Sequence, residues 1–368
     1  MRIAFDHQIF GWQRFGGISR YFFELANHLA KAEAPSPECR IICPLFVNNY
    51  LVEAGAALQV TGVHVPAIRR TGRFYRMINS AFAPFLLESW RPDILHETYY
   101  SNKTVAPEGC RIVLTVFDMI HELYPEHFAA WDTTRKEKEV AVSRADHIIC
   151  ISENTRRDLI RLMKVPEEKT SVVHLGFSLT HQALSNLPPP RRPFLLFVGS
   201  RGGYKNFERL LQAYASRPEL RNWYDLVAFG GGYLSGRECA LIQKLNLDKE
   251  QVRQVDGDDG VLGALYQQAA LFVYPSLYEG FGIPPLEAMS FDCPVACSNT
   301  SSMPEVVADA AIMFDPSDTE SIASALERLC TDQALRVVLQ QRGRDRLQTF
   351  SWRQCAVETM NIYRKVLQ

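Results

Sequence analysis

The sequence has no excess of charge of either sign. Its 40 Lys and Arg residues nearly balance 41 Asp and Glu residues, which leaves a formal net charge of -1. Without a large positive charge, the chain lacks the electrostatic basis of general nucleic-acid binding. We therefore expect no nucleic-acid partner, and any anionic group must be met by a local basic patch.

Cysteine spacing gives no sign of a disulfide framework or a metal site. The nine cysteines include no CxxC pair, and Cys43 and Cys150 lie inside the apolar runs RIICPL and HIICIS. This pattern is typical of reduced, buried thiols in cytoplasmic proteins. We expect no cysteine to hold a metal ion.

Long apolar segments are also missing. The first ten residues, MRIAFDHQIF, lack the apolar stretch of a secretory signal. No run reaches the roughly 18 residues that are needed to cross a bilayer. The sequence has no internal repeat and no low-complexity segment either. We expect a cytoplasmic protein, with peripheral contact to the inner face of the plasma membrane left open.

What the sequence does contain is an alternation of short apolar runs with amphipathic, helix-like stretches. In the first half, the strand-like runs are 2–6, 40–47, 93–97, 111–118, 147–152 and 171–176. In the second half, they are 194–200, 225–231, 252–256, 271–276, 294–299 and 310–315. Strands separated by helices favour a parallel, doubly wound sheet, so the predicted fold class is α/β.

A proline-rich segment divides this alternation. Residues 186–193 read NLPPPRRP, with four prolines in eight residues, which favours an extended linker. A chain of 368 residues is also long for a single core. We predict a first domain over 1–185, a linker over 186–193 and a second domain over 194–350. The amphipathic segment 351–368 is predicted to form a helix that returns to the first domain.

The segment that points most clearly to chemistry follows the strand-like run 271–276. It reads SLYEGFGIPPLE, and Gly280 and Gly282 allow backbone N–H groups to approach a ligand closely. Ligands bind at the carboxyl ends of strands in open α/β sheets. We expect Glu279 in the loop and Glu287 in the first turn of the next helix to face one ligand. A glycine turn followed by a capping acid is the simpler alternative.

This segment resembles the E-x7-E signature of the family 4 glycosyltransferases. Similar segments occur along nearly the whole chain; they are GGISRYFFEL, FVGSRGGYKN, ALYQQAALFVYPS, PVACSNTSSMPEVVADAAIMFDP and FSWRQCAVETMNIY. The resemblance implies a GT-B fold, in which two Rossmann-like domains with parallel sheets face each other across a cleft. It also implies that the second domain binds a nucleoside diphosphate sugar and that the first binds the acceptor.

The resemblance assigns roles to residues of the second domain. It implies that Glu279 contacts hydroxyl groups of the donor sugar and that Glu287 holds the ribose hydroxyls. The rest of the donor loop is expected to be Gly280, Phe281 and Gly282. Charged acceptors make the stronger hydrogen bonds, so two carboxylates suit two diols.

Arg201 and Lys205 lie in the loop after the strand-like run 194–200. By the same resemblance, they are expected to stabilise charge on the leaving diphosphate in place of a metal ion, so we expect no metal and no bound cofactor. Gly16 and Gly17 precede the helix predicted over 19–31, and they are expected to direct N–H groups at the diphosphate. Solvated surface cations and a plain strand-to-helix turn are the simpler alternatives.

One segment departs from the family pattern. Many relatives have His before Asp at the end of the run 111–118, but here the residue is Phe117, followed by Asp118. We predict that Asp118 or His121 takes over the contact with the transferred sugar, or that Phe117 shapes the site for a less polar sugar face. A strand-end cap for Asp118 and a surface position for His121 are the alternatives.

A basic, aromatic-rich segment over 68–91 is predicted to be a helix. Its basic residues are Arg69, Arg70, Arg73 and Arg76, and they alternate with aromatic and aliphatic side chains. This pattern is typical of helices that bind anionic membranes. It is equally typical of an ordinary surface helix with a basic outer face, and the sequence leaves both interpretations open.

The resemblance implies a retaining hexosyltransferase. The resemblance is closest to bacterial mannosyltransferases of polysaccharide assembly, so we expect GDP-mannose as donor and a glycan or lipid-diphosphate-linked oligosaccharide as acceptor. An NAD-dependent oxidoreductase is disfavoured, because no G-x-G-x-x-G follows a strand-like run. A glycan-binding protein without activity and a sugar-nucleotide epimerase of the same fold are the remaining alternatives.

Overall fold

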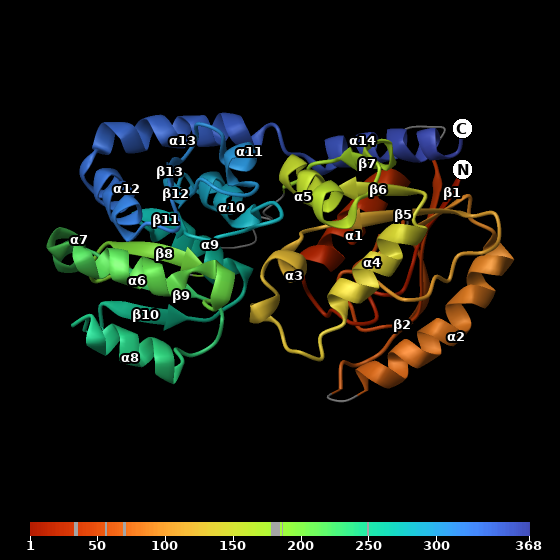
Figure 1. Cartoon of the computed structure of the whole chain (residues 1–368), viewed down its shortest axis with the longest axis horizontal. Coiled ribbons are helices and arrows are strands. Elements are labelled where there is room, and N and C mark those ends of the chain that lie inside the picture. The colour runs from red at the N-terminus through yellow and green to blue at the C-terminus, as the bar shows by residue number, and fades with distance from the viewer. Residues whose placement is uncertain (33–35, 56, 69–70, 178–184, 186, 249) are drawn as a thin grey trace. The chain divides into compact units, whose positions relative to one another are not determined.

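The computed structural model describes residues 1–32, 36–55, 57–68, 71–177, 185, 187–248 and 250–368. It divides into two compact units, of which the first is Met1–Gly176 with Phe350–Gln368 and the second is Phe177–Thr349. In each unit, helices surround a sheet of parallel strands (Figure 1). The predicted α/β class is confirmed.

The first unit is built on a sheet in the order β3-β2-β1-β4-β5-β6-β7, and its described strand pairings are parallel. The strands are β1 (Arg2–Phe5), β2 (Glu38–Phe46), β3 (Gln59–His64), β4 (Ile94–Glu97), β5 (Arg111–Val116), β6 (His147–Cys150) and β7 (Thr170–Val172). The helices are α1 (Gly17–Ala30), α2 (Gly72–Trp90), α3 (Ile120–Leu123), α4 (Thr134–Arg144), α5 (Glu153–Met163) and α14 (Trp352–Val366), with short 3-10 turns η1 (Pro125–His127) and η2 (Glu167–Lys169).

The second unit is built on a parallel sheet in the order β10-β9-β8-β11-β12-β13. The strands are β8 (Phe194–Val198), β9 (Asp225–Phe229), β10 (Val252–Val255), β11 (Leu271–Tyr274), β12 (Val295–Ser298) and β13 (Ile312–Phe314). The helices are α6 (Phe207–Ser216), α7 (Pro218–Trp223), α8 (Gly236–Lys244), α9 (Asp259–Gln268), α10 (Ile283–Ser290), α11 (Met303–Val307), α12 (Thr319–Thr331) and α13 (Gln333–Leu347), with a 3-10 turn η3 (Gly203–Lys205).

In both sheets, the strand order reverses beside the first strand. From β1 the sheet grows through β2 to β3, and the chain then crosses to β4 on the other side; β8 stands in the same way between β9 and β11. At such a switch point, the loops that leave the two central strands diverge and create a ligand crevice. The switch points therefore lie at the ends of β1 and β4 in the first unit and of β8 and β11 in the second.

Each predicted strand-like run corresponds to a strand of the structure, but one strand was not predicted. β3 lies at the edge of the first sheet, beside β2, and its residues are mostly exposed. Its sequence, QVTGVH, has few apolar residues. An edge strand needs little apolar surface, and so the apolar pattern did not reveal it.

The predicted domain boundary at residue 185 lies inside the second unit. The backbone N–H of Ser185 donates to the carbonyl of Gly260 (3.2 Å), and the Gln268 side chain donates to the carbonyl of Leu187 (3.4 Å). These bonds attach the segment to the second unit, in which residues 187–193 form neither helix nor strand. Asn186, the first residue of the predicted linker, lies outside the described residues.

The carboxyl-terminal helix α14 belongs to the first unit. Gly176 packs so closely against Trp352 that a Cβ atom at this glycine would collide with the tryptophan backbone. Near the other end of the helix, the Tyr363 hydroxyl lies 2.5 Å from Nδ1 of His96 on β4. Nε2 of His96 lies 2.8 Å from the Thr115 hydroxyl on β5. A buried polar chain therefore joins α14 to two central strands.

His96 should make the stability of the first unit depend on pH. Burial lowers the pKa of this histidine from 6.5 to about 3, so between these values the unfolded chain binds a proton that the folded chain does not. Stability is fully present above pH 6.5 and is lost as pH falls, by about 1.4 kcal/mol per pH unit. In His96→Gln, the slope of unfolding free energy against pH should decrease by this amount.

Thr115→Val is the matched control, because it removes a hydrogen-bond partner of His96 without removing a titrating group. This variant should be less stable than the native chain at every pH and keep the native slope. An unchanged slope in His96→Gln, measured by urea denaturation across this pH range, would show that His96 does not couple folding to pH.

Candidate functional site

The switch point of the second unit brings Lys205 and Glu279 together. Lys205 ends the short turn η3 after β8, and Glu279 lies in the loop after β11. The Lys205 ammonium donates to Oε1 of Glu279 at 2.7 Å, and both side chains are largely buried. The ammonium also lies 3.3 Å from the hydroxyl of Tyr274, the last residue of β11. A cation and a carboxylate are thus fixed at the edge where open α/β sheets bind ligands.

Backbone and hydroxyl contacts hold the Glu279 loop in place. The N–H of Glu279 donates to the Ser301 hydroxyl (3.0 Å). The Ser302 hydroxyl lies within hydrogen-bond distance of the carbonyls of Glu279 and Phe281, at 2.9 and 2.7 Å. In addition, Leu277 N–H donates to the carbonyl of Tyr204 in the loop after β8 (2.7 Å). Three strand-end loops therefore support one another, so the loop is preorganised.

Gly282 sets the direction of helix α10. It has a φ of 105°, in the region that favours glycine, and a side chain there would collide with Met303. Glu287 is the fifth residue of α10, so the prediction that it lies in the first turn is wrong. The buried Tyr266 hydroxyl donates to its Oε2 at 3.1 Å. Gly280 and Phe281 are both buried in the same loop.

Arg201, which was expected to contact the donor phosphates, is held by protein partners in this structure. Its side chain is almost fully buried, and Nε donates to Oε1 of Glu238 at 2.6 Å. The remaining nitrogens donate to backbone carbonyls of the loop after β9, with bonds of 2.6 Å to Gly230, 2.8 Å to Gly232 and 3.0 Å to Tyr233. Gly230, Gly231 and Gly232 all have positive φ values, which turn these carbonyls toward one cation. In this structure, Arg201 therefore holds the loop after β9 in place.

Glu238 is adapted to this partner. It lies in the first turn of α8 and forms a capping box with Ser235. Burial opposes its ionisation, but hydrogen bonds from Ser235 and the Arg201 guanidinium hold the pKa of the carboxyl below its usual value. The carboxylate is therefore charged at neutral pH and secures Arg201.

In the first unit, Gly16 and Gly17 lie at the beginning of α1, two residues before the predicted start of this helix. The Ser19 hydroxyl donates to the carbonyl of Gly16 (3.1 Å), and its N–H donates to the Gln13 side chain (3.3 Å). The glycine pair is thus at a helix amino terminus, where backbone N–H groups and the helix dipole favour an anion.

Phe117, predicted to shape the sugar site, packs against helix α1. Its ring is buried and packs edge to face against Tyr21 and Phe22 of α1, with ring centroids 5.3 and 6.0 Å apart. Asp118 Oδ1 accepts a hydrogen bond from the N–H of Ile120 (3.0 Å), so it caps the start of α3. This arrangement agrees with the strand-end cap that the sequence left open.

His121 is half-buried beside Asp132 and stacks on Phe128, with ring centroids 3.8 Å apart. Its Nδ1 is buried without a hydrogen-bond partner among the described residues. Burial, followed by the charge of Lys138, lowers the pKa of the imidazole. The lowered pKa favours a neutral imidazole at neutral pH, and the enclosed Nδ1 is not open to a ligand in this structure.

Lys138 is a residue of this region that the sequence did not reveal. It lies on the charged helix α4, yet its side chain is fully buried and donates to Oε2 of Glu122 (2.8 Å) and to the carbonyl of Asp118 (2.9 Å). The ammonium also lies over the ring of Tyr100. Lys138 therefore holds the connection between β5 and α3 in place.

The basic residues predicted to meet a membrane are only partly described. Arg69 and Arg70 lie outside the described residues. Arg73 and Arg76 are exposed in the first turns of α2. Among the described residues, no helix, α2 included, is long and apolar enough to span a bilayer. Nor do His, Cys, Asp and Glu side chains form a cluster of three or more that could hold a metal ion in the described parts.

Comparison with known proteins identifies the family. Residues 15–181 match the family described as Glycosyltransferase Family 4, and residues 182–346 match Glycosyl transferases group 1. The chain is 30% identical over 308 residues to O-antigen chain mannosyltransferase B of Escherichia coli, and the match covers 79% of each protein. This chain belongs to glycosyltransferase family 4.

Further similarities agree with this assignment. The glycosyltransferase is 29% identical over 276 residues to the serotype-specific mannosyltransferase WbdA of Escherichia coli, which is 70% of this chain but only 34% of WbdA. It therefore spans about a third of that relative. Among solved structures, sucrose-phosphate synthase from Thermosynechococcus elongatus superposes with a TM-score of 0.76, at 21% identity, over 99% of this chain and 98% of the other. That likeness shows a shared GT-B fold.

The residues that support Glu279 and Glu287 in this glycosyltransferase were not predicted as site residues. Tyr266 and Tyr274 appear as core positions in apolar runs, although their hydroxyls contact Glu287 and Lys205. Ser301 and Ser302 lie in the family-like segment after β12 but carry no pattern of their own. A tyrosine at the carboxyl end of a buried strand is the one signal that could have indicated a polar contact.

Proposed function

We propose that this glycosyltransferase transfers mannose from GDP-mannose to a hydroxyl group of a glycan acceptor, with retention of configuration and without a metal ion. The observation that carries the proposal is the Lys205–Glu279 pair at the switch point of the second unit. The choice of mannose and of a cell-surface glycan rests on the two mannosyltransferase relatives.

Lys205 can serve both its carboxylate partner and a diphosphate. An ammonium group has three N–H donors, and here the contacts described are with Glu279 and the Tyr274 hydroxyl. A phosphate oxygen that approaches the ammonium would gain a charge-assisted bond, which becomes stronger as negative charge develops on the leaving group. Lys205 thus supplies positive charge where a divalent ion acts in other transferases.

The proposed step balances without an enzymic nucleophile. The bond between C1 of mannose and the diphosphate oxygen breaks, and the acceptor oxygen bonds to C1 on the same face. The acceptor proton passes to the departing phosphate, so GDP leaves and an α-mannoside forms. In this step, Glu279 would hold sugar hydroxyls and Glu287 the ribose hydroxyls, each with one oxygen positioned by a protein donor.

A screen of nucleoside diphosphate sugars tests the proposal. Purified protein is incubated with each sugar nucleotide and a manno-oligosaccharide acceptor, with and without EDTA, and the anomeric configuration of the product is read by NMR. GDP-mannose should give an α-linked product in EDTA. An inverted product or an absolute need for metal would refute the mechanism. Conversion of the donor without acceptor would favour an epimerase.

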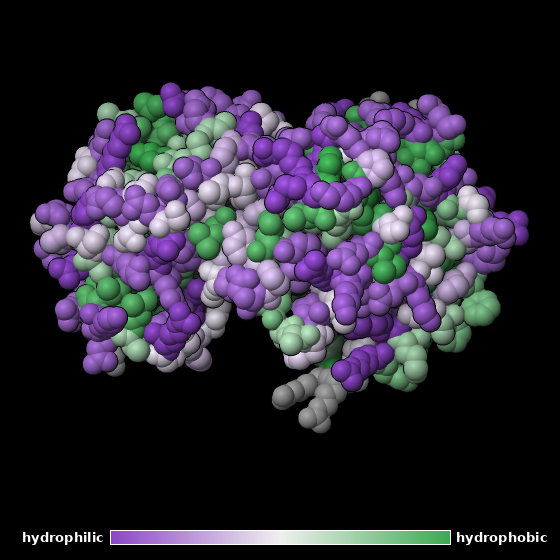
Figure 2. Space-filling model, viewed as in Figure 1, coloured by the Kyte–Doolittle hydropathy of each residue, from purple (hydrophilic) through white to green (hydrophobic). Residues whose placement is uncertain are grey.

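We also propose that helix α2 rests on an anionic membrane surface, which would bring the enzyme to a lipid-linked acceptor. Its outward side carries the exposed apolar side chains Phe74, Met77, Phe82 and Phe85, which recur at helical spacing. Figure 2 shows apolar residues along the edge that α2 occupies in Figure 1. Arg73 and Arg76 add positive charge beside this stripe. Apolar and basic groups on one helix are what interfacial binding requires.

Phe85→Ser with Phe74→Ser should abolish sedimentation with vesicles that contain phosphatidylglycerol, because both rings would otherwise enter the lipid interface. The control is Val337→Ser, at an exposed apolar position on α13 of the other unit. Equal sedimentation of the double variant and the native chain would exclude α2 as the membrane contact.

A further inference from the structure

Two buried tyrosine hydroxyls contact the two carboxylates that are proposed to bind the donor. The Tyr266 hydroxyl, on helix α9, donates to Oε2 of Glu287 at 3.1 Å. The Tyr274 hydroxyl, at the end of β11, is hydrogen-bonded to Glu279 and lies 3.3 Å from the Lys205 ammonium. Both tyrosine side chains are buried. The phenol rings are therefore enclosed in the second unit while their oxygen atoms reach the site.

Packing alone does not require a hydroxyl group at either position. Phe272 contacts both tyrosines, with ring centroids 5.5 Å from Tyr266 and 5.7 Å from Tyr274. Tyr266 also stacks on Phe291, with centroids 6.0 Å apart. Phenylalanine would fill this aromatic layer as well, and a buried hydroxyl group is costly unless it has a partner. Since the rings pack on one another, they hold the two hydroxyl groups at a fixed separation.

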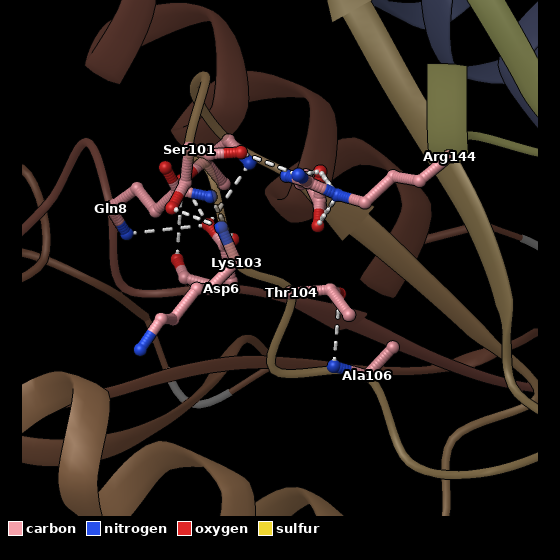
Figure 3. A network of polar contacts seen from close by, with 9 residues as sticks. Asp6, Gln8, Ser101, Lys103, Thr104, Ala106 and Arg144 are labelled. Carbon is pink, nitrogen blue, oxygen red and sulfur yellow. Dashed lines mark hydrogen bonds and ion pairs between the residues drawn. The ribbon is translucent and has the colours of Figure 1, made fainter. Parts of the chain in front are cut away.

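Two other buried carboxylates of this chain are held by arginine instead. In the first unit, Arg144 donates from Nε to both oxygens of Glu97, at 3.0 and 3.1 Å, and another of its nitrogens donates to the carbonyl of Ser101 (Figure 3). In the second unit, Arg201 pairs with Glu238. A guanidinium group offsets the charge of the carboxylate that it binds, so such a pair is suited to holding the fold together.

A phenol positions a carboxylate without offsetting its charge. Burial, followed by the charge of Glu287, raises the pKa of Tyr266 well above its usual value. The pKa of Tyr274 is raised in the same way, by burial and then by the charge of Glu279. Both hydroxyl groups are therefore neutral donors at neutral pH. Carboxylates held in this way remain strong acceptors for the hydroxyl groups of a ligand.

We infer that Tyr274 and Tyr266 are positioning residues for the donor, which act through the carboxylates that they hold. Tyr274 directs Glu279 and the Lys205 ammonium toward the sugar and the leaving diphosphate. Tyr266 directs Glu287 toward the ribose. The inference rests on the proposed function and adds two residues that contribute to it without contacting the substrate.

The variants Tyr274→Phe and Tyr266→Phe each remove one hydroxyl group and should differ in their kinetic effects. Tyr274→Phe should lower kcat with GDP-mannose by about tenfold, because small displacements of groups that act in the transition state are costly. Tyr266→Phe should raise KM for GDP-mannose and Kd for GDP by about tenfold, and by more than it lowers kcat, because the ribose is bound equally in the ground state and the transition state. Initial rates and isothermal titration calorimetry measure these constants.

Tyr214→Phe is the matched control. The Tyr214 hydroxyl also belongs to a buried side chain of the second unit, and it donates to the carbonyl of Tyr224 at 2.6 Å. All three variants lose one such hydrogen bond and should lose similar thermal stability, but Tyr214→Phe should keep native kcat and native affinity for GDP. In a Lys205→Gln background, Tyr274→Phe should lower kcat little further, because residues that act as a unit are not additive.

Kinetic constants and GDP affinities of both site variants equal to those of Tyr214→Phe would overturn the inference. A loss in Tyr274→Phe that is undiminished in the Lys205→Gln background would do the same. If native protein binds GDP but transfers no mannose, the proposed function fails, and the GDP affinity of Tyr266→Phe relative to Tyr214→Phe decides the inference. If native protein binds UDP instead, the choice of GDP fails and the same comparison is made with UDP. Binding of neither nucleotide would overturn both proposals.

Discussion

Replacing Lys205 with glutamine is expected to lower kcat for glycosyl transfer by about 10²–10³-fold, the usual cost of removing one group that stabilises charge in a transition state. Glutamine retains an N–H donor, so the buried Glu279 keeps a hydrogen-bond partner and the unit stays folded. The loss should therefore appear in initial rates at saturating donor and acceptor, with little change in thermal unfolding.

Three further variants test whether this loss is specific to the Lys205–Glu279 pair. Lys244→Gln removes an exposed lysine at the end of α8 and should transfer at the native rate. Glu279→Gln should lose activity to the same order as Lys205→Gln. The double variant should lose little more, because residues that act as a unit are not additive. Native kcat in Lys205→Gln would exclude the lysine from the reaction.

Replacing Arg201 with alanine is expected to destabilise the second unit by about 3–5 kcal/mol, the typical cost of breaking a buried ion pair by removing one partner. The substitution leaves Glu238 without its cation and frees the carbonyls of Gly230, Gly232 and Tyr233. Urea denaturation followed by circular dichroism would measure this as a lower midpoint for the second unit.

Substitutions at Arg201 and Glu238 provide controls for this loss of stability. Arg201→Lys keeps the charge but cannot reproduce the planar fork, so it should recover only a small part of the stability. Arg201→Met combined with Glu238→Gln should recover more, because it leaves no unpaired buried charge. If Arg201→Ala instead unfolds at the native midpoint and loses activity, the phosphate contact expected from the sequence is the correct role.

The fold was largely predictable because each central strand is a short apolar run between amphipathic segments. Parallel strands buried on both faces are nearly continuous in hydrophobicity, so runs such as FLLFV and LFVY stand out. β3 has no such run because it is an exposed edge. The division between the units was misplaced because prolines mark an extended segment but do not show which unit that segment packs against.

The candidate site was predictable where chemistry follows from loop position, as for Lys205 and Glu279. The contacts of Arg201 were not predictable, since most of its partners are backbone carbonyls, which any residue type can supply, and Glu238 lies 37 residues away in the sequence. The packing of Phe117 was not predictable for a related reason, because its contacts with Tyr21 and Phe22 come from a helix far away in sequence. The burial of Lys138 could not be predicted because its neighbours on α4 are charged and solvent-facing.

Because α14 packs on the first unit, the second unit can complete its folding on the ribosome before the first unit does. Domains generally fold as units, and amino-terminal ones first, while the chain is being made. Here Phe177–Thr349 is one uninterrupted stretch, whereas the first unit lacks Phe350–Gln368 until those residues have also been made. Until then, His96 has no Tyr363 hydroxyl beside it, and the surface that later covers Cys355 and Met360 is open to solvent. The first unit, whose synthesis begins first, is therefore the last to complete its fold.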